Sequence, residues 1–285
     1  MEDKFIESRN EFSNGSLGRR DFLKGLFLFA GGAAVIPLLT ANLDKRVKAQ
    51  VVKADDARLQ TGFVKYQGES GEVTAYMARP KEEGKLPGVI VIHENKGLQP
   101  HIEDVARRVA LEGFMAIAPD ALSPLGGTPD EVENATPMMR KLDADANLKN
   151  YLAAVEYLKT HPESTGKVGC MGFCWGGGIS NQLAVNSADL AVAVPFYGRQ
   201  PAPEDVPKIK AALLLHYAAL DERINQGIPA YEKALKAASV DYQIFTYEGA
   251  GHAFFNDSRP ERYHEEAARL AWERTIAFFN EKLKS

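Results

Sequence analysis

The sequence predicts an α/β protein whose mostly parallel sheet is covered by helices on both faces. Short apolar runs rich in β-branched residues recur along the chain, as in GVIVIHE at 88–94, and such runs are typical of strands buried on both faces. Segments with helical spacing of apolar residues alternate with these runs, as expected for parallel strands joined by helices. No long polar linker interrupts the chain after about residue 60, so this region is predicted to be a single domain.

The expected elements follow one another in a regular order. After the strand at 88–94, residues 102–113 have helical spacing and end at a glycine, and 114–120 form the next expected strand. Residues 121–140 are rich in Gly, Pro and acidic residues, so they are expected to form a loop over the surface. The remaining expected elements are a helix at 148–161, a strand at 167–173, a helix at 177–185, strands at 191–198, 211–219 and 241–247, and a closing helix at 261–283.

Composition, charge and residue spacing give no indication of nucleic-acid, metal or cofactor binding. The chain has 285 residues, of which 45% are hydrophobic and 25% charged, as in ordinary globular proteins that bury a sizeable core. A formal net charge of −4 provides no basic surface for a phosphate backbone, so we expect no nucleic-acid partner. The histidines and cysteines show neither H-x-x-x-H nor C-x-x-C spacing, so neither a metal nor another cofactor is expected. The glycine run 176–178 belongs to a predicted turn and helix and is not a phosphate-binding loop.

The first 49 residues are predicted to be an export signal. An arginine pair at 19–20 and the sequence FLK at 22–24 precede an apolar stretch at 26–41, which is too short and too rich in glycine to span a membrane comfortably. The layout resembles a twin-arginine signal, although Gly18 stands where Ser or Thr is usual. We therefore expect the twin-arginine export machinery as a partner, and contact with the membrane only through this segment.

Small residues at 47–49 provide a cleavage site, which predicts a mature domain at 50–285 that is periplasmic or otherwise exported. The alternative is that the signal remains uncleaved and tethers the protein as a helical anchor. Two cysteines could form a disulfide in an oxidising compartment. Cys170 and Cys174 lie on a strand and on the turn after it, where disulfide geometry is hard to reach, so both are predicted to remain thiols.

Cys174 is the predicted nucleophile. It lies in GFCWG at 172–176, a Gly-x-Cys-x-Gly that matches the nucleophile elbow with Cys in place of Ser. A tight strand-to-helix turn leaves no room for side chains on its neighbours, which accounts for the two glycines, and the amino end of the following helix favours a thiolate. The alternative is a buried structural cysteine, an interpretation that suits Cys170 in mid-strand.

Asp221 and His252 are the predicted partners of the nucleophile. Asp221 follows the strand at 211–219, where an acid can hold an imidazole by its ring N–H, although a loop aspartate that caps the next turn is the alternative. His252 lies among small residues after the last strand; its alternative is a solvated loop histidine. The chain order of nucleophile, acid and histidine is the order of an acyl-transfer triad built on a parallel sheet.

Glu94 ends the strand at 88–94 and opens the loop that normally supplies one oxyanion-hole N–H. The backbone N–H groups of Asn95 and Trp175 are therefore the candidates for that hole. A carboxylate at this position would oppose ionisation of a nearby thiol, and the alternative is a surface glutamate. His93 is interpreted as a core histidine with satisfied hydrogen bonds rather than as a group that supports the site.

These motifs together resemble the dienelactone hydrolase family, a cysteine-dependent branch of the α/β-hydrolases. The resemblance implies an α/β-hydrolase fold and a triad at Cys174, Asp221 and His252, with Glu94 holding the resting cysteine protonated until substrate displaces it. It spans about residues 60–283 and is carried by HENKGL (93–98), APDAL (118–122), GFCWGG (172–177), FYGRQ (196–200), ALDERI (219–224) and GAGHAF (249–254).

The sequence departs from that family where the substrate is held. The family grips a substrate carboxylate with arginines, one of them four residues after the histidine, and here that position is Asn256. Arg199, Arg223 and Arg259 lie near the predicted mouth and are candidate replacements. Tyr197 and Trp175 are candidate pocket walls, although aromatic residues at strand ends are more often packing residues.

The predicted function is an exported hydrolase that cleaves a small carboxylic ester or lactone through a thioester on Cys174. One alternative is a peptidase or acyltransferase on the same fold. A second is a non-catalytic binder of a carbohydrate or another small ligand. A third is a redox sensor that acts through an exposed Cys174 of low pKa, which would need neither Asp221 nor His252.

Overall fold

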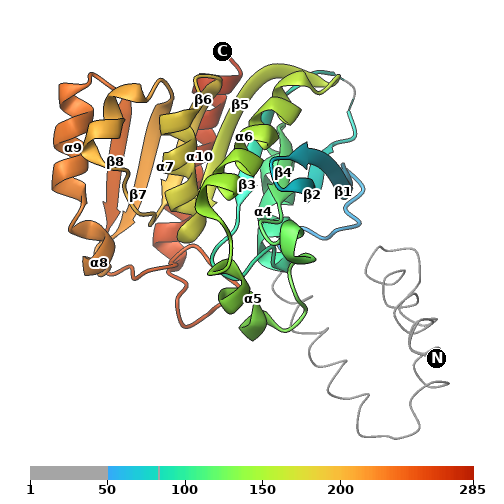
Figure 1. The fold of residues 1–285 in the computed structure, drawn as a ribbon, viewed down its shortest axis with the longest axis horizontal. Coiled ribbons are helices and arrows are strands. Elements are labelled where there is room, and N and C mark those ends of the chain that lie inside the picture. Colours follow the sequence, from blue (N-terminus) through green and yellow to red (C-terminus); the bar gives the residue numbers. More distant parts are fainter. Residues whose placement is uncertain (1–50, 83) are drawn as a thin grey trace, which may run out of the picture.

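The computed structural model describes residues 51–82 and 84–285, so the predicted export signal at 1–49 lies outside the described residues. This part of the chain forms an eight-stranded sheet with the order β1-β2-β4-β3-β5-β6-β7-β8 and helices on both faces (Figure 1). The strands are β1 (Leu59–Gly68), β2 (Gly71–Pro80), β3 (Leu86–Ile92), β4 (Met115–Pro119), β5 (Ser164–Phe173), β6 (Leu190–Phe196), β7 (Ala212–Ala218) and β8 (Tyr242–Tyr247).

Pairing within the sheet is parallel from β4 through β3 and onward to β8, whereas β1 and β2 join at one edge as an antiparallel hairpin. The predicted mostly parallel α/β sheet is thus confirmed. The helices are α4 (Pro100–Leu111), α5 (Val132–Met139), α6 (Ala144–Thr160), α7 (Trp175–Asn186), α8 (Glu222–Asn225), α9 (Ile228–Ala237) and α10 (Glu265–Leu283), with 3₁₀ turns η1 (Ser123–Leu125) and η2 (Pro203–Lys208).

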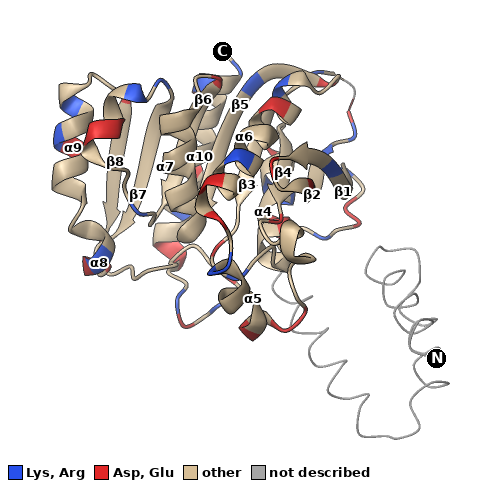
Figure 2. Cartoon of the chain, in the orientation of Figure 1, with Lys and Arg blue, Asp and Glu red and all other residues tan. Residues whose placement is uncertain are grey.

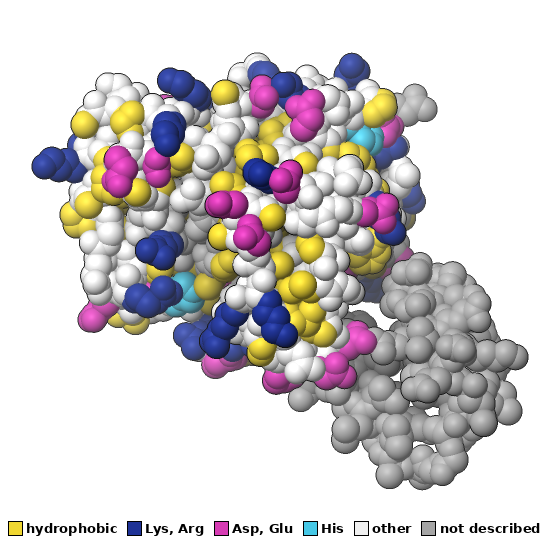
Figure 3. Space-filling view, viewed as in Figure 1, with side chains coloured by type: hydrophobic (Ala, Val, Ile, Leu, Met, Phe, Trp, Pro, Cys, Tyr) yellow, Lys and Arg dark blue, Asp and Glu magenta, His cyan; other side chains and the backbone are white. Residues whose placement is uncertain are grey.

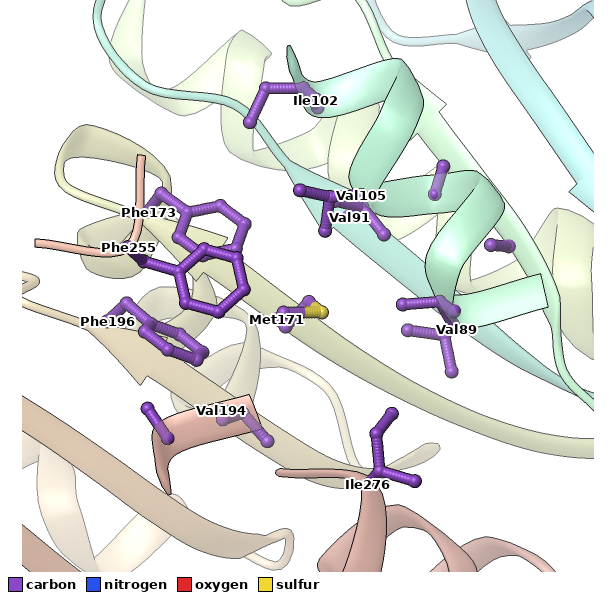
Figure 4. Close-up of a cluster of buried hydrophobic side chains, with 14 of the residues drawn as sticks. Val89, Val91, Ile102, Val105, Met171, Phe173, Val194, Phe196, Phe255 and Ile276 are labelled. Atoms are coloured by element: carbon purple, nitrogen blue, oxygen red, sulfur yellow. The ribbon is translucent and has the colours of Figure 1, made fainter. Parts of the chain in front are cut away.

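Two hydrophobic cores form because side chains alternate across each buried strand. On β3, Val89 and Val91 belong to a core that also contains residues of α4 and α10. Ile90 and Ile92 belong to the core on the opposite face, which contains residues of α6, α7 and α9. Figure 4 shows the first core, where Met171 of β5 lies among residues from both helices and neighbouring strands. Charged residues lie mainly on the helices and loops, and few lie on the central strands (Figure 2).

The expected surface loop at 121–140 was wrong in part, because it contains η1 and the helix α5. Glycine, proline and acidic residues suggested irregular structure, but the buried residues Ala135 and Met139, one turn apart, give α5 an apolar contact with the second core. The helix α6 begins at Ala144, earlier than expected, because the Asp143 side chain accepts a hydrogen bond from the Ala146 N–H at 2.8 Å. The β1–β2 hairpin and the helices α8 and α9 were not predicted.

Candidate active site

The predicted site residues gather where the parallel strands end, at the lower edge of the sheet in Figure 1. Glu94 follows β3, Cys174 follows β5, Asp221 follows β7 and His252 follows β8. Figure 3 shows a histidine side chain at the surface near this edge, beside basic side chains. Placement beyond the carboxyl ends of parallel strands is the usual position of a ligand site in such sheets.

Cys174 occupies a strained turn between β5 and α7. Its backbone angles are φ 56° and ψ −110°, a conformation that residues other than glycine rarely adopt. The Cys174 N–H donates to the Phe196 carbonyl at 3.0 Å, which fixes the turn against the end of β6. Tyr197 and Ala253, which also belong to this end of the sheet, have positive φ values of 39° and 68°. Strain is therefore concentrated around the candidate nucleophile.

The glycines of the turn are required by close backbone approach, as the sequence predicted. A Cβ on Gly172 would lie 2.1 Å from the Gly176 carbonyl oxygen, and a Cβ on Gly176 would lie 2.5 Å from the carbonyl oxygens of Ile92 and His93. Real Cβ atoms do not come so close to backbone. The absence of these two side chains allows the elbow to pack directly against the loop that carries Glu94.

The structure brings Asp221 and His252 into contact. The His252 Nδ1 atom hydrogen-bonds the carboxylate of Asp221, which is only 7% exposed. Their two loops are joined by a backbone hydrogen bond from the Leu220 N–H to the Ala250 carbonyl at 3.0 Å. The Tyr197 ring packs against the His252 ring, with 5.0 Å between centroids. An imidazole held in this way is oriented with Nε2 available for proton transfer.

Cys174 carries a neutral thiol at neutral pH. Burial raises its pKa to about 11, and the Glu94 carboxylate adds to this effect. The Trp175 N–H and the Arg223 guanidinium act in the opposite direction and are outweighed. The helix end thus favours a thiolate through the Trp175 N–H, as predicted, but it does not prevail in the resting site, because a sulfur removed from water and placed near a carboxylate resists ionisation. The exposed, low-pKa thiol required for a redox sensor is likewise not found.

Glu94 is buried rather than a surface residue, with 9% of its surface exposed. Its Oε2 atom accepts a hydrogen bond from Asn256 Nδ2 at 2.9 Å, and its buried Oε1 atom has no hydrogen-bond partner among residues 51–82 and 84–285. The neighbouring Tyr197 phenol is also buried, and its pKa is raised by burial and then by the Glu94 carboxylate. The sequence marked Asn256 only as a departure from a family pattern; nothing in it indicated the contact with Glu94.

His93 is a core histidine with both ring nitrogens engaged, as the sequence analysis interpreted it. Its Nε2 atom accepts from the Ala121 N–H at 3.1 Å, so its Nδ1–H donates to the Glu94 carbonyl at 2.6 Å. Burial lowers its pKa, which keeps the ring neutral. The ring stacks on Trp175 at 5.3 Å between centroids. This ring therefore connects the Glu94–Asn95 loop to Trp175, the first residue of α7. Asn95 and Trp175 carry the two candidate oxyanion N–H groups.

A cavity of about 290 Å³ lies beside Glu94. Arg259 lines it, although its Nε atom is hydrogen-bonded to Glu261 at 3.1 Å. Arg199 and Arg223 are exposed and do not line it, and the Trp175 indole packs against His93 and Tyr151. Of the candidate site residues, Glu94 and Arg259 line this cavity; its walls also include Lys96, Gln99, Ile102, Val132 and Asn256.

Three further observations concern metals, membranes and the thiols. No group of His, Cys, Asp and Glu side chains within residues 51–82 and 84–285 is arranged to hold a metal ion. Among the same residues, no helix has the length and apolar character needed to cross a membrane. Both cysteines are free, and the buried Cys170 thiol lies 3.5 Å from the Ser180 hydroxyl, in the core rather than at the site.

Comparison with known proteins connects this geometry to a family. Residues 73–283 match the model of the dienelactone hydrolase family. A protein of Escherichia coli O157:H7, provisionally named a carboxymethylenebutenolidase, is 33% identical over 247 residues, which cover 81% of this chain and 90% of that protein.

Solved structures agree in fold and family. The crystal structure of a protein provisionally named a dienelactone hydrolase from Klebsiella pneumoniae superimposes with a TM-score of 0.70 at 30% identity, covering 78% of this chain and 98% of that one. An esterase structure at 15% identity, with a TM-score of 0.64, covers 84% of this chain and 88% of that chain and shares the fold alone. The fold of the described chain is therefore that of the α/β-hydrolases.

Proposed function

The chain belongs to the dienelactone hydrolase family and is a hydrolase of lactones or esters, and from that premise we propose that it cleaves a small substrate through a thioester on Cys174. The observation that carries this proposal is the strained elbow at Cys174, at the same edge of the sheet as a histidine that is already held by Asp221. Such an arrangement presents a nucleophile, a base and an orienting acid in the roles that acyl transfer requires.

In the first half of the reaction, the Cys174 sulfur attacks the carbonyl carbon while His252 Nε2 takes the thiol proton. The negative charge that develops on the carbonyl oxygen is stabilised by the backbone N–H groups of Asn95 and Trp175. Collapse of the tetrahedral intermediate breaks the bond to the leaving oxygen, and His252 returns the proton to it. The thiol of high pKa ionises only as the new bond forms, so attack and proton transfer are coupled.

In the second half, a water molecule attacks the thioester while His252 takes one of its protons. The tetrahedral intermediate expels the Cys174 sulfur, which regains its proton from His252, and the carboxylic acid product leaves. Asp221 holds the same imidazole nitrogen throughout, so that the ring serves as base and then as acid in each half.

The test is turnover of aryl esters and small lactones by the protein and by Cys174→Ala. We expect hydrolysis by the parent and loss of about 10³-fold or more in the variant, because the covalent route is removed. Equal rates in both proteins would show that Cys174 is not the nucleophile. Burst release of the aryl alcohol, followed by slower steady turnover, would directly reveal an acyl-enzyme.

We also propose export through the twin-arginine route. The support is the arginine pair at 19–20, with the apolar stretch 26–41 after it, all of which lies outside the described residues. Replacing both arginines by lysine is expected to leave the protein in the cytosolic fraction. Unchanged recovery from the exported fraction would contradict this.

A further inference from the structure

The carboxylate of Glu94 is held by a neutral partner. Asn256 Nδ2 donates to its Oε2 atom at 2.9 Å, and the two residues are 5% and 9% exposed. The Asn256 amide is itself oriented, because its Oδ1 atom accepts from the Ser258 N–H at 3.2 Å and from the Ser258 hydroxyl at 2.5 Å. With its oxygen engaged in this way, the amide presents its nitrogen to Glu94. The contact joins the loops after β3 and β8.

No cation neutralises this carboxylate within the described chain. No Lys or Arg nitrogen of residues 51–82 and 84–285 forms an ion pair with Glu94 within 4.0 Å. Arg259, which lines the same cavity, is paired with Glu261, and Lys96 is half-exposed, where solvent screens its charge. The buried Oε1 atom has no hydrogen-bond partner there either.

The other charged groups around Cys174 do not offset Glu94. Asp221, which hydrogen-bonds the His252 ring, adds a second negative charge that also raises the thiol pKa. The Arg223 guanidinium lowers the thiol pKa, but less than burial and Glu94 raise it, and its side chain is exposed. Tyr197 is kept neutral by its raised pKa. An acyl group that reaches Cys174 therefore meets an unpaired carboxylate.

We propose that Asn256 determines which substrates the site accepts according to their charge. Asn256 holds Glu94 in place without neutralising it, so the site selects acyl groups that carry no negative charge near the carbonyl. The inference rests on the proposed role of Cys174 as nucleophile. Two like charges in a partly buried site repel strongly, so a carboxylate adjacent to the scissile carbonyl is disfavoured. The same unpaired charge adds to the effect of burial in keeping the thiol protonated, which provides a second readout that requires no substrate.

The test replaces Asn256 by arginine in the full-length protein. Asn256→Arg is expected to pair with Glu94 and to accelerate alkylation of Cys174 by neutral iodoacetamide about tenfold or more at pH 7–9, because an opposite charge shifts a neighbouring pKa by about 1–3 units. The kcat/KM of an ester that bears a carboxylate, divided by that of its uncharged analogue, should be about tenfold higher in Asn256→Arg than in the parent protein.

The control is Asn134→Arg, the same chemical change at an exposed position of the helix α5, which should alter neither readout. Glu94→Gln alone should also accelerate alkylation, because it removes the negative charge that opposes ionisation of the thiol. Cys174→Ala gives the background from Cys170, which is fully buried.

Unchanged alkylation and an unchanged substrate ratio in a folded Asn256→Arg protein, verified by its thermal unfolding, would overturn the proposal. So would alkylation of Glu94→Gln at the parental rate. If Asn256→Arg does not fold, Glu94→Gln must by itself accelerate alkylation and favour the anionic ester, and its failure to do so also refutes the inference. Full turnover by Cys174→Ala would instead contradict the nucleophile proposal, and the alkylation experiment separates the two.

Discussion

At the scale of single residues, the site shows two carboxylates with different surroundings. Asp221 contacts the His252 imidazole, whereas Glu94 contacts a neutral amide and has one oxygen without a partner in the described chain. A carboxylate that binds an imidazole stabilises the imidazolium formed during acyl transfer. A carboxylate without a cation instead opposes the formation of any nearby anion. In the proposed mechanism the two acids therefore have different roles: Asp221 supports proton transfer to His252, whereas Glu94 restrains ionisation of Cys174.

Asp221→Asn is expected to lower kcat/KM by about 10²–10⁴-fold, because the amide cannot stabilise the imidazolium or hold the same tautomer. The matched control is Glu222→Gln, which removes the charge of the exposed neighbouring acid and should leave activity within about twofold of the parent. Steady-state kinetics on one aryl ester measures both variants. Similar losses in both would show that general charge, rather than the Asp221–His252 contact, matters.

At the scale of elements, the site depends on how closely α7 approaches the loop after β3. Gly176 lies at this point of contact, with carbonyl oxygens of the loop within 2.5 Å of where its Cβ would be. Gly178, two residues later in α7, has no heavy atom nearer than 3.8 Å to its own Cβ position. Two glycines of one helix thus have different reasons to be there. The first is required by packing, and the second is free to change.

Gly176→Ala is expected to destabilise the protein by about 1–3 kcal/mol, because backbone atoms must move to admit the methyl group. It should also lower kcat, since the displaced elbow moves the Trp175 N–H that we propose as an oxyanion donor.

Gly178→Ala, the control, should stabilise the helix by up to about 1 kcal/mol and retain activity. Urea unfolding together with ester kinetics measures both variants. Equal stability and activity in the two would contradict the packing argument.

At the scale of the whole molecule, His216 connects three elements. It lies fully buried on β7, and its ring nitrogens contact the Tyr247 hydroxyl of β8 at 2.8 Å and the Thr275 hydroxyl of α10 at 3.1 Å. Burial, with a smaller contribution from the positive charge of Arg274, lowers its pKa to about 3. The ring is therefore neutral in the folded protein across the range in which an unfolded histidine becomes charged.

The pH dependence of stability follows from this difference. Below about pH 6.5 the unfolded chain protonates its histidine, whereas folded His216 stays neutral until about pH 3. The unfolded state then binds the additional proton, so the free energy of unfolding falls by up to about 1.4 kcal/mol per pH unit as the pH decreases through this window. His216→Gln should reduce that slope. Urea titrations at several pH values between 4 and 8 measure it, and an identical slope in both proteins would refute the assignment.

The sequence predicted most of the parallel sheet and the contact between Asp221 and His252, because buried strands and strand-end polar residues leave local patterns. It missed the β1–β2 hairpin, whose strands have exposed faces and few continuous apolar residues. It also missed the hydrogen bond between Asn256 and Glu94, which are 162 positions apart. Such a contact depends on how the fold places two distant loops side by side, and no pattern in the sequence around either residue indicates it. The raised pKa of Cys174, caused first by burial and then by the Glu94 carboxylate, has no local signature either.

The burial of the Cys174 sulfur also affects how the enzyme would withstand oxidants. Peroxides and disulfide-forming reagents react with the thiolate rather than with the thiol. With a pKa of about 11, roughly one molecule in ten thousand carries the thiolate at pH 7. A hydrolase that depends on such a cysteine is therefore expected to remain active for long periods where no reductant regenerates it, since so little of its sulfur is in the form that oxidants attack.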